Sequence, residues 1–258
     1  CIPSELALAC RIAREFNYSE INLNCGCPSN RVQNAQFGAV MMIDAKKTAD
    51  CVSAMLDTAN IPITVKHRTG VDESDSYEFM RDFVGTVADK GCKTFLVHAS
   101  KAWLSGLSPK ENRTLPTLEY DRVYRLKRDF PDLEIIINGG VVSIAESLKH
   151  LEKIDGVMMG REAYTNPYVL ATVDRDIYQN NREPKPRRQI VEEYLPFVEQ
   201  ELANGVKLNS LTRHMLGLFR GMPMARAFRR HISENACKPN AQIKVITEAL
   251  KKTEAHLT

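Results

Sequence analysis

The sequence predicts an α/β fold, namely a TIM barrel that lacks its first three strands, followed by a C-terminal helical bundle. Strand-like apolar runs recur at residues 20–24, 61–66, 93–98, 133–138 and 156–160. Each run is followed by a segment whose apolar residues have helical spacing, and this alternation is typical of parallel sheets. The chain has no Gly-rich nucleotide-binding fingerprint, which favours a barrel over a doubly wound sheet.

The predicted elements follow one another in a regular order. The chain opens on a helix near residues 4–16, and further amphipathic helices are expected at 45–56, 77–88 and 120–130. A closed barrel needs eight strands, whereas the sequence contains five strand-like runs. We therefore expect the chain to be the C-terminal part of a longer protein. The alternative is an open sheet with two unprotected edges.

The strand pattern stops after residue 178. Residues 1–178 are predicted to form the partial barrel, 179–187 a polar, proline-stiffened linker, and 188–258 a helical domain with helices near 188–203, 209–217, 224–236 and 242–255. Residues 180–258 carry 14 Lys and Arg against 8 Asp and Glu, whereas residues 1–179 carry 21 against 24. A basic segment on an acidic body is typical of a polyanion-binding appendage, although surface Lys and Arg mostly aid solubility.

The composition excludes several classes of protein. No apolar run approaches the length of a membrane span, and the first residues lack the pattern of a secretory signal. The seven cysteines form an odd, irregular set, which favours a reducing compartment without disulfides. Cys25 and Cys27 lack the second Cys or His pair that a zinc site needs. We expect a cytoplasmic monomer that binds neither a membrane nor a metal.

The first strand-like run ends at a turn that carries a thiol. Asn22 and Asn24 lie two residues apart and so share one strand face, where amides are poor β formers and indicate hydrogen bonding. Cys27 follows on a Gly-Cys-Pro turn. A free cysteine is most often a small buried hydrophobe. The polar face and the turn instead favour a catalytic thiol at a strand end.

All five predicted strands end in polar residues or glycines, and βα enzymes hold their functional groups at these ends. At the ends of the last two predicted strands, glycines let backbone N–H groups approach an anion, and the guanidinium of Arg161 can bind it with two hydrogen bonds. These two strand ends therefore predict a phosphorylated cofactor. Lys66 would be a fixed cation and His98 a hydrogen-bond donor beside a flavin ring. The alternatives are a satisfied core histidine, a surface ion pair at Arg161 and ordinary turn glycines.

These stretches together resemble the tRNA-dihydrouridine synthases, specifically the bacterial A-type subfamily. The resemblance rests on residues 22–29, 65–68, 97–99, 108–113, 137–140, 160–161, 212–217 and 225–231, and it extends over essentially the whole chain. It implies an FMN-dependent enzyme that uses NADPH to reduce the C5–C6 double bond of D-loop uridines, at positions 20/20a, in tRNA. The implied chemistry is hydride transfer from reduced flavin to C6 and protonation of C5 by Cys27.

The resemblance also implies roles for individual residues. Cys27 matches the family's catalytic cysteine, and Asn24 matches an asparagine that contacts the RNA. The basic helix contributes Arg226 and Arg229 as tRNA contacts, although a solvated helix face is the alternative. The family's flavin contacts match Lys66, His98, Asn138, Gly139, Gly140, Gly160 and Arg161.

The loop at residues 103–116 is long for a βα connection. Its Lys110 and Arg113 are expected to reach the RNA or to close the site.

Two other interpretations stay open. A flavin-dependent barrel acting on free pyrimidines would share the phosphate site and the cysteine, but it would have no use for the basic segment. A non-catalytic RNA-binding remnant is suggested by the missing strands, and a flavin spectrum of the purified chain would distinguish it from an enzyme.

Overall fold

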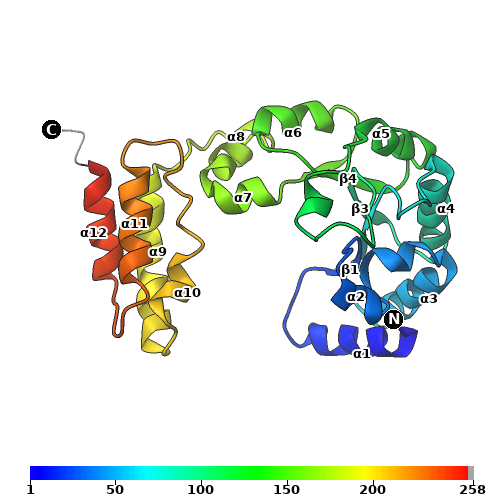
Figure 1. Cartoon of the computed structure of the whole chain (residues 1–258), viewed down its shortest axis with the longest axis horizontal. Helices are drawn as coiled ribbons and strands as arrows, with labels where there is room; N and C mark the ends of the chain where they lie inside the picture. The colour runs from blue at the N-terminus through cyan, green and yellow to red at the C-terminus, as the bar shows by residue number, and fades with distance from the viewer. Residues whose placement is uncertain (255–258) are drawn as a thin grey trace. The chain divides into compact units, whose positions relative to one another are not determined.

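The computed structural model describes residues 1–254, which divide into two compact units (Figure 1). The first unit comprises residues 1–141 and 146–158, and the second comprises 142–145 and the chain from residue 159 onward. The sequence placed a domain boundary after residue 178, whereas the division by contacts falls after residue 158. Among the described residues, no helix has the length and apolar composition needed to cross a membrane.

One parallel sheet organises the first unit. Within residues 1–254 the sheet has five strands, and their spatial order is their order in the chain, which confirms the predicted α/β architecture. The first residue of each strand lies within two residues of the predicted start. The strands are β1 (Ile21–Cys25), β2 (Ile63–Arg68), β3 (Thr94–His98), β4 (Glu134–Asn138) and β5 (Gly156–Met158).

Helices connect the strands, as the spacing of apolar residues predicts. Two of them carry side-chain caps, since Asp44 accepts a hydrogen bond from the Lys47 amide and Ser76 accepts one from the Phe79 amide. The helical elements up to β5 are α1 (Pro3–Arg14), α2 (Asn30–Asn34), η1 (Gly38–Met42), α3 (Ala45–Leu56), α4 (Tyr77–Ala88), η2 (Glu111–Arg113), α5 (Tyr120–Asp129) and α6 (Ile144–Leu151).

The two faces of the sheet differ in chemistry because side chains alternate along each strand. One face carries a buried apolar row, in which Leu23, Val65, Phe95 and Ile135 are register partners. This face supplies the core of the unit. The opposite face carries the polar residues of the strand ends, and it therefore holds the candidate site.

The regular elements in the described part of the second unit are all helices. Its core is formed by buried apolar side chains such as Val198, Phe228 and Ile246, which come from α9, α11 and α12. These three helices lie side by side in Figure 1. The elements are α7 (Arg161–Thr165), η3 (Pro167–Thr172), α8 (Val173–Asp176), α9 (Arg187–Ala203), α10 (Leu208–Thr212), α11 (Ala225–Asn235) and α12 (Lys244–Glu254).

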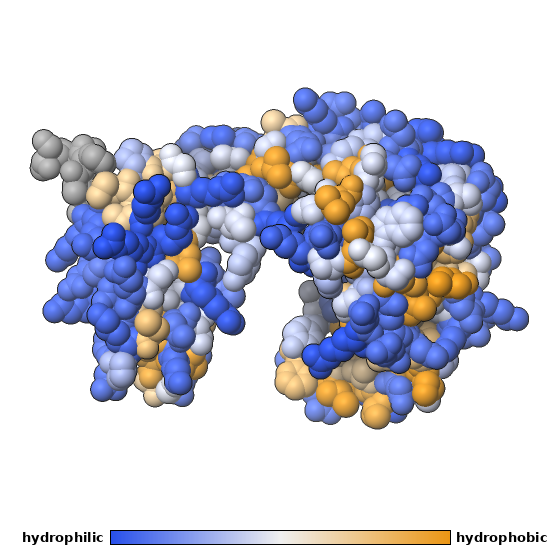
Figure 2. Space-filling view, viewed as in Figure 1, coloured by the Kyte–Doolittle hydropathy of each residue, from blue (hydrophilic) through white to orange (hydrophobic). Residues whose placement is uncertain are grey.

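Apolar side chains also reach the surface of the first unit. Leu8 and Ile12 on α1 are each half exposed, and Figure 2 shows hydrophobic side chains gathered over this helix. The second unit presents mostly hydrophilic side chains in the same view. A charged or polar cover is the ordinary surface of a small helical unit.

Candidate active site

The polar face of the sheet brings together four of the predicted site residues. Asn24 on β1 pairs in register with Lys66 on β2, and His98 on β3 pairs with Asn138 on β4. Because partners in a parallel sheet project to the same face, these side chains form two neighbouring rows at the carboxyl ends. Arg68 joins the second row as the register partner of His98.

Hydrogen bonds fix the orientation of Asn138 and His98. The Asn138 Nδ2 group donates to the Met158 carbonyl at 2.7 Å. The Asn138 Oδ1 atom therefore faces the His98 ring and accepts from Nδ1 at 2.8 Å. This arrangement places the proton of neutral His98 on Nδ1 and sets the ring at the strand ends.

Lys66 is a cation held inside the first unit. Burial lowers the pKa of its ammonium group to about 8, and the nearby Arg68 contributes to the shift. Lys66 is therefore mostly protonated at neutral pH. Two neighbouring cations favour an anionic ligand, since an added negative charge would offset their repulsion.

The turn that carries Cys27 is clamped on three successive carbonyl groups. The Gly26 oxygen accepts from Arg68 Nε at 3.2 Å, the Cys27 oxygen accepts from the Ala39 amide at 2.9 Å, and the Pro28 oxygen accepts from Gln33 Nε2 at 2.7 Å. The Asn24 Oδ1 atom also accepts from the Gly26 amide at 3.0 Å. A partly exposed thiol is thus held on a rigid turn.

Gly38 is required for this clamp. Its φ of +73° lies in the left-handed region, and a Cβ atom there would stand 2.3 Å from the Cys27 oxygen. Only glycine allows η1 to approach the Cys27 turn this closely.

Arg68 stands at a predicted strand end within a matching motif, but the sequence assigned it no role at the site. Its side chain is 4% exposed, and burial lowers its pKa to about 10, so it stays protonated at neutral pH. Besides Gly26, its guanidinium donates from Nη1 to Ser100 Oγ at 3.0 Å, the Lys101 carbonyl at 3.2 Å and the Asn112 carbonyl at 3.1 Å. No local sequence pattern marks these partners.

The predicted loop of residues 103–116 is organised around Asn112, which is fully buried. The Asn112 Oδ1 atom accepts from the Trp103 amide at 2.8 Å, and its Nδ2 group donates to the Trp103 carbonyl at 2.9 Å. Lys110 and Arg113, the expected RNA contacts, flank this anchor and are exposed. The hydrogen bonds of Asn112 therefore fix the backbone of the loop that carries the two exposed cations.

The predicted glycines divide between the two units. Gly139 and Gly140 follow β4 with φ values of +111° and +73°, and the Tyr120 hydroxyl donates to the Gly139 carbonyl at 2.8 Å. A Cβ atom on Gly140 would stand 2.5 Å from the Leu118 side chain. Gly160 and Arg161 lie in the second unit, at the start of α7.

Arg226 and Arg229 also lie in the second unit, on α11. Both are exposed, while Phe228 between them is buried in the core. Arg230 on the same helix pairs with Glu234 at 3.0 Å. The helix thus presents two arginines one turn apart on its solvent face.

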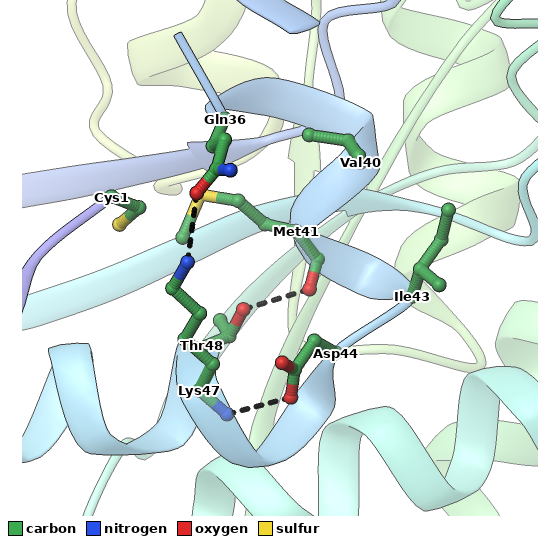
Figure 3. A pocket seen from close by; sticks show the side chains of 8 residues that line it. All are labelled: Cys1, Gln36, Val40, Met41, Ile43, Asp44, Lys47 and Thr48. Atoms are coloured by element: carbon green, nitrogen blue, oxygen red, sulfur yellow. Dashed lines mark hydrogen bonds between the residues drawn. The ribbon is translucent and has the colours of Figure 1, made fainter.

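A cavity of about 220 Å³ lies beside η1 and α3, and the residues that line it are not among the predicted site residues (Figure 3). Its polar groups are paired with one another: Lys47 Nζ donates to Gln36 Oε1 at 2.9 Å, and Thr48 Oγ1 donates to the Met41 carbonyl at 2.7 Å. The cavity therefore offers no convergent set of polar groups for a ligand.

The cysteines are free thiols in this structure. Cys1 and Cys51 approach to 3.3 Å between their sulfur atoms, a hydrogen-bonding distance rather than a disulfide. Within residues 1–254, no group of three or more His, Cys, Asp or Glu side chains is arranged to hold a metal ion.

Comparison with known proteins gives a consistent result over the chain. A family model described as dihydrouridine synthase matches residues 1–254. The tRNA-dihydrouridine(20/20a) synthase of Vibrio vulnificus is 56% identical over 256 residues, covering 99% of this chain and 78% of the relative. Proteins of the same name from Shewanella oneidensis and Escherichia coli K12 are 52% and 54% identical, covering 99% and 96% of this chain and 76% and 72% of each relative.

Proposed function

The chain belongs to the dihydrouridine synthase family, and we propose that it reduces the C5–C6 double bond of D-loop uridines at positions 20/20a in tRNA. The observation that carries the proposal is the 56% identity over 99% of the chain to a tRNA-dihydrouridine(20/20a) synthase. The proposal includes FMN as the cofactor, NADPH as the reductant and action as a cytoplasmic monomer.

The proposal extends to the architecture. The five parallel strands, whose spatial order is their order in the chain, would belong to an eight-stranded barrel. The helical second unit would be the tRNA-binding domain, and its exposed Arg226 and Arg229 would contact phosphates.

Enzymes of this family depend on a flavin, and the residues of the polar sheet face fit one. Lys66 supplies a half-buried cation for the anionic part of the ring system, and His98 is held by Asn138 at the strand ends. Gly139 and Gly140 belong to the same proposed cofactor set, as do Gly160 and Arg161 at the start of α7. When bound, FMN would supply the hydride for the reduction.

Cys27 is proposed as the acid that protonates C5 of the uracil ring. A protonated thiol can act as a general acid and give its proton to the enolate that develops when hydride reaches C6. The clamped turn holds the thiol in place before the substrate arrives, which reduces the entropy that must be lost in the reaction.

A uridine must leave its stack to reach this thiol, so the enzyme needs contacts on the nucleotide and on the surrounding phosphates. Asn24 lies on the strand that leads into the Cys27 turn, and we propose that its amide holds the flipped base. Lys110 and Arg113 extend from the anchored loop and are proposed to grip the RNA backbone.

A single-turnover measurement tests the proposal. The full-length protein is reduced with NADPH without oxygen and mixed with tRNA that lacks dihydrouridine, and flavin reoxidation is followed by absorbance. We expect Cys27→Ala to slow tRNA-dependent reoxidation at least about 100-fold, because it removes the general acid. The matched control is Cys237→Ala, which removes an exposed thiol on the second unit. An unchanged rate in Cys27→Ala would exclude this thiol from the reaction.

A further inference from the structure

Two side chains join the Cys27 turn to the loop of residues 103–116, and each of them bonds to both segments. Gln33 Nε2 on α2 donates to the Pro28 carbonyl at 2.7 Å and to the Leu104 carbonyl at 2.8 Å. Arg68 donates to the Gly26 carbonyl and, from Nη1, to the Asn112 carbonyl. The turn and the loop are therefore docked on a shared pair of donors.

The four acceptors just named are all backbone carbonyl groups. A bond to backbone fixes the path of the chain rather than one side chain, so both segments are held in register with each other. Removing either donor would leave two or more carbonyl groups without a partner in a half-buried region, which is costlier than the loss of an exposed hydrogen bond.

The loop can couple an RNA contact on its surface to the Cys27 turn because its interior is held by several interactions. Asn112 holds the Trp103 backbone on both sides, as described above. Lys101 forms an ion pair with Asp75 at 3.1 Å and stands 4.1 Å above the centre of the Trp103 ring. An RNA contact at Lys110 or Arg113 therefore acts on a body that is bonded directly to the Cys27 turn.

We propose that Gln33 and Arg68 are positioning residues that couple RNA contact on the 103–116 loop to the placement of Cys27. This inference rests on the proposed function. It adds that the loop is part of the catalytic apparatus, since binding energy gained at its cations is used to orient the thiol. Neither residue needs to touch the substrate for this role.

The first test uses Gln33, because it is half-buried and its replacement leaves the core intact. We expect Gln33→Ala to lower the single-turnover rate of tRNA-dependent reoxidation about tenfold, the effect of losing two modest hydrogen bonds. The tRNA dissociation constant should change less than threefold, and the rate of flavin reduction by NADPH should stay the same. The control is Gln36→Ala, which removes a nearby bond to Lys47 but none to the loop.

A double-mutant cycle then tests the coupling itself. If RNA contact at Arg113 acts on Cys27 through Gln33, Arg113→Ala should slow the wild type but have little further effect on the single-turnover rate in the Gln33→Ala background. Effects that multiply in the double variant would show that the two residues act independently and would overturn the coupling.

Fluorescence of Trp103, the single tryptophan of the chain, gives a readout that does not depend on activity. We expect Gln33→Ala and the charge-altering Gln33→Glu to increase quenching of Trp103 by acrylamide, since the loop loses its anchor on α2. Gln36→Ala should leave quenching unchanged. Unaltered quenching in both Gln33 variants would refute the docking, even if the variants were inactive for another reason.

The two proposals fail in different ways. If the wild-type protein never reoxidises its flavin with tRNA, the proposed function is wrong, whereas the quenching of Trp103 still reports whether the loop is docked. If the wild type is active and Gln33→Ala keeps its full rate, the function stands and the coupling is wrong.

Discussion

The cations of the polar sheet face in the first unit and the arginines of α11 in the second unit lie in opposite surroundings. In the first unit, Arg68 is buried and Lys66 is half-buried, and burial lowers the pKa of each. In the second unit, Arg226 and Arg229 project from α11 into solvent. Buried charges act over one fixed geometry and resist salt screening, whereas exposed charges act through a diffuse field that salt weakens. Charges held in one geometry suit chemistry on a small group, whereas exposed charges suit binding to a long polyanion.

The largest effect that distinguishes the two regions should come from His67, a neighbour of both buried cations. Its Nδ1 group bonds to the Arg68 carbonyl at 2.7 Å, its ring packs against Phe83, and burial lowers its pKa to about 4. The unfolded chain takes up this proton near pH 6.5. Stability is therefore fully present above pH 6.5 and falls by about 3 kcal/mol as the pH drops to 4.

Urea unfolding of the wild type and His67→Gln between pH 7 and pH 4.5 measures this difference. We expect the free energy of unfolding to fall more steeply with decreasing pH in the wild type than in the variant. The difference in slope should correspond to the uptake of one proton on unfolding. Parallel pH dependences would mean that His67 accepts a proton without leaving the core. Replacement of the exposed Arg229 by Gln is the control and should not change the slope.

Lys66 provides the next test, because it is half-buried and burial lowers its pKa to about 8. We expect Lys66→Met to weaken FMN binding about 30-fold at pH 7, the value of one charge-assisted contact of about 2 kcal/mol. In the wild type, affinity should fall as the pH rises through about 8 and Lys66 loses its proton.

Fluorescence titration of FMN at pH 6.5, 7.5 and 8.5 measures both effects. The control is Lys90→Met, which removes a surface lysine paired with Asp50 and should leave the affinity near that of the wild type. Equal losses in both variants would mean that buried and exposed charges contribute alike, which would break the contrast between the two regions.

The sequence could predict the parts of the fold that local patterns govern. Strands β1 to β4 and helices α3, α4 and α9 lie where apolar periodicity places them, because one face of each packs on a core. The predicted helix at 209–217 is shorter, ending at Thr212. A Cβ atom on Gly217 would stand 2.1 Å from the Thr165 carbonyl, so the chain there follows a long-range contact that no local pattern contains.

The candidate site was predictable only where strand ends carry it. Asn24, Lys66, His98 and Asn138 meet because parallel strands bring their carboxyl ends to one edge. Gln33 and Asn112 were not predicted, since each acts through bonds to backbone groups distant in the chain or buried within a loop. Such acceptors are the same in every residue type, and the sequence therefore leaves no mark of them.

The exposed arginines should give a smaller and salt-dependent effect. We expect Arg226→Glu combined with Arg229→Glu to weaken tRNA binding about tenfold and to reduce the slope of log affinity against log salt by about 2, one per lost phosphate contact. NADPH oxidation without tRNA should be unchanged. Filter binding at several salt concentrations measures the slope.

The control for this charge reversal is Lys185→Glu with Arg188→Glu, which changes the net charge by the same amount at the start of α9. Both residues pair with glutamates there. If the control variant loses as much affinity, the second unit attracts RNA through its overall charge rather than through a defined face of α11.

The smallest effect should come from the backbone that begins α11. Met224 occupies the N-cap position with φ +61°, a left-handed conformation that costs a non-glycine residue about 1–2 kcal/mol. We expect Met224→Gly to stabilise the protein by about 1 kcal/mol, because the relief of strain exceeds the added entropy of the unfolded chain. Asn240→Gly, at φ +57°, is the matched control and should gain less, since asparagine tolerates this region. Thermal unfolding of both variants measures the difference, and a destabilised Met224→Gly would show that contacts of the methionine side chain outweigh the strain. If Met224→Gly also tightens tRNA binding, the exposed arginines depend on a well-formed start of α11. They would then be positioned by their helix as Lys66 and Arg68 are positioned by their strand. The two regions would in that case differ only in how strongly salt screens their charges.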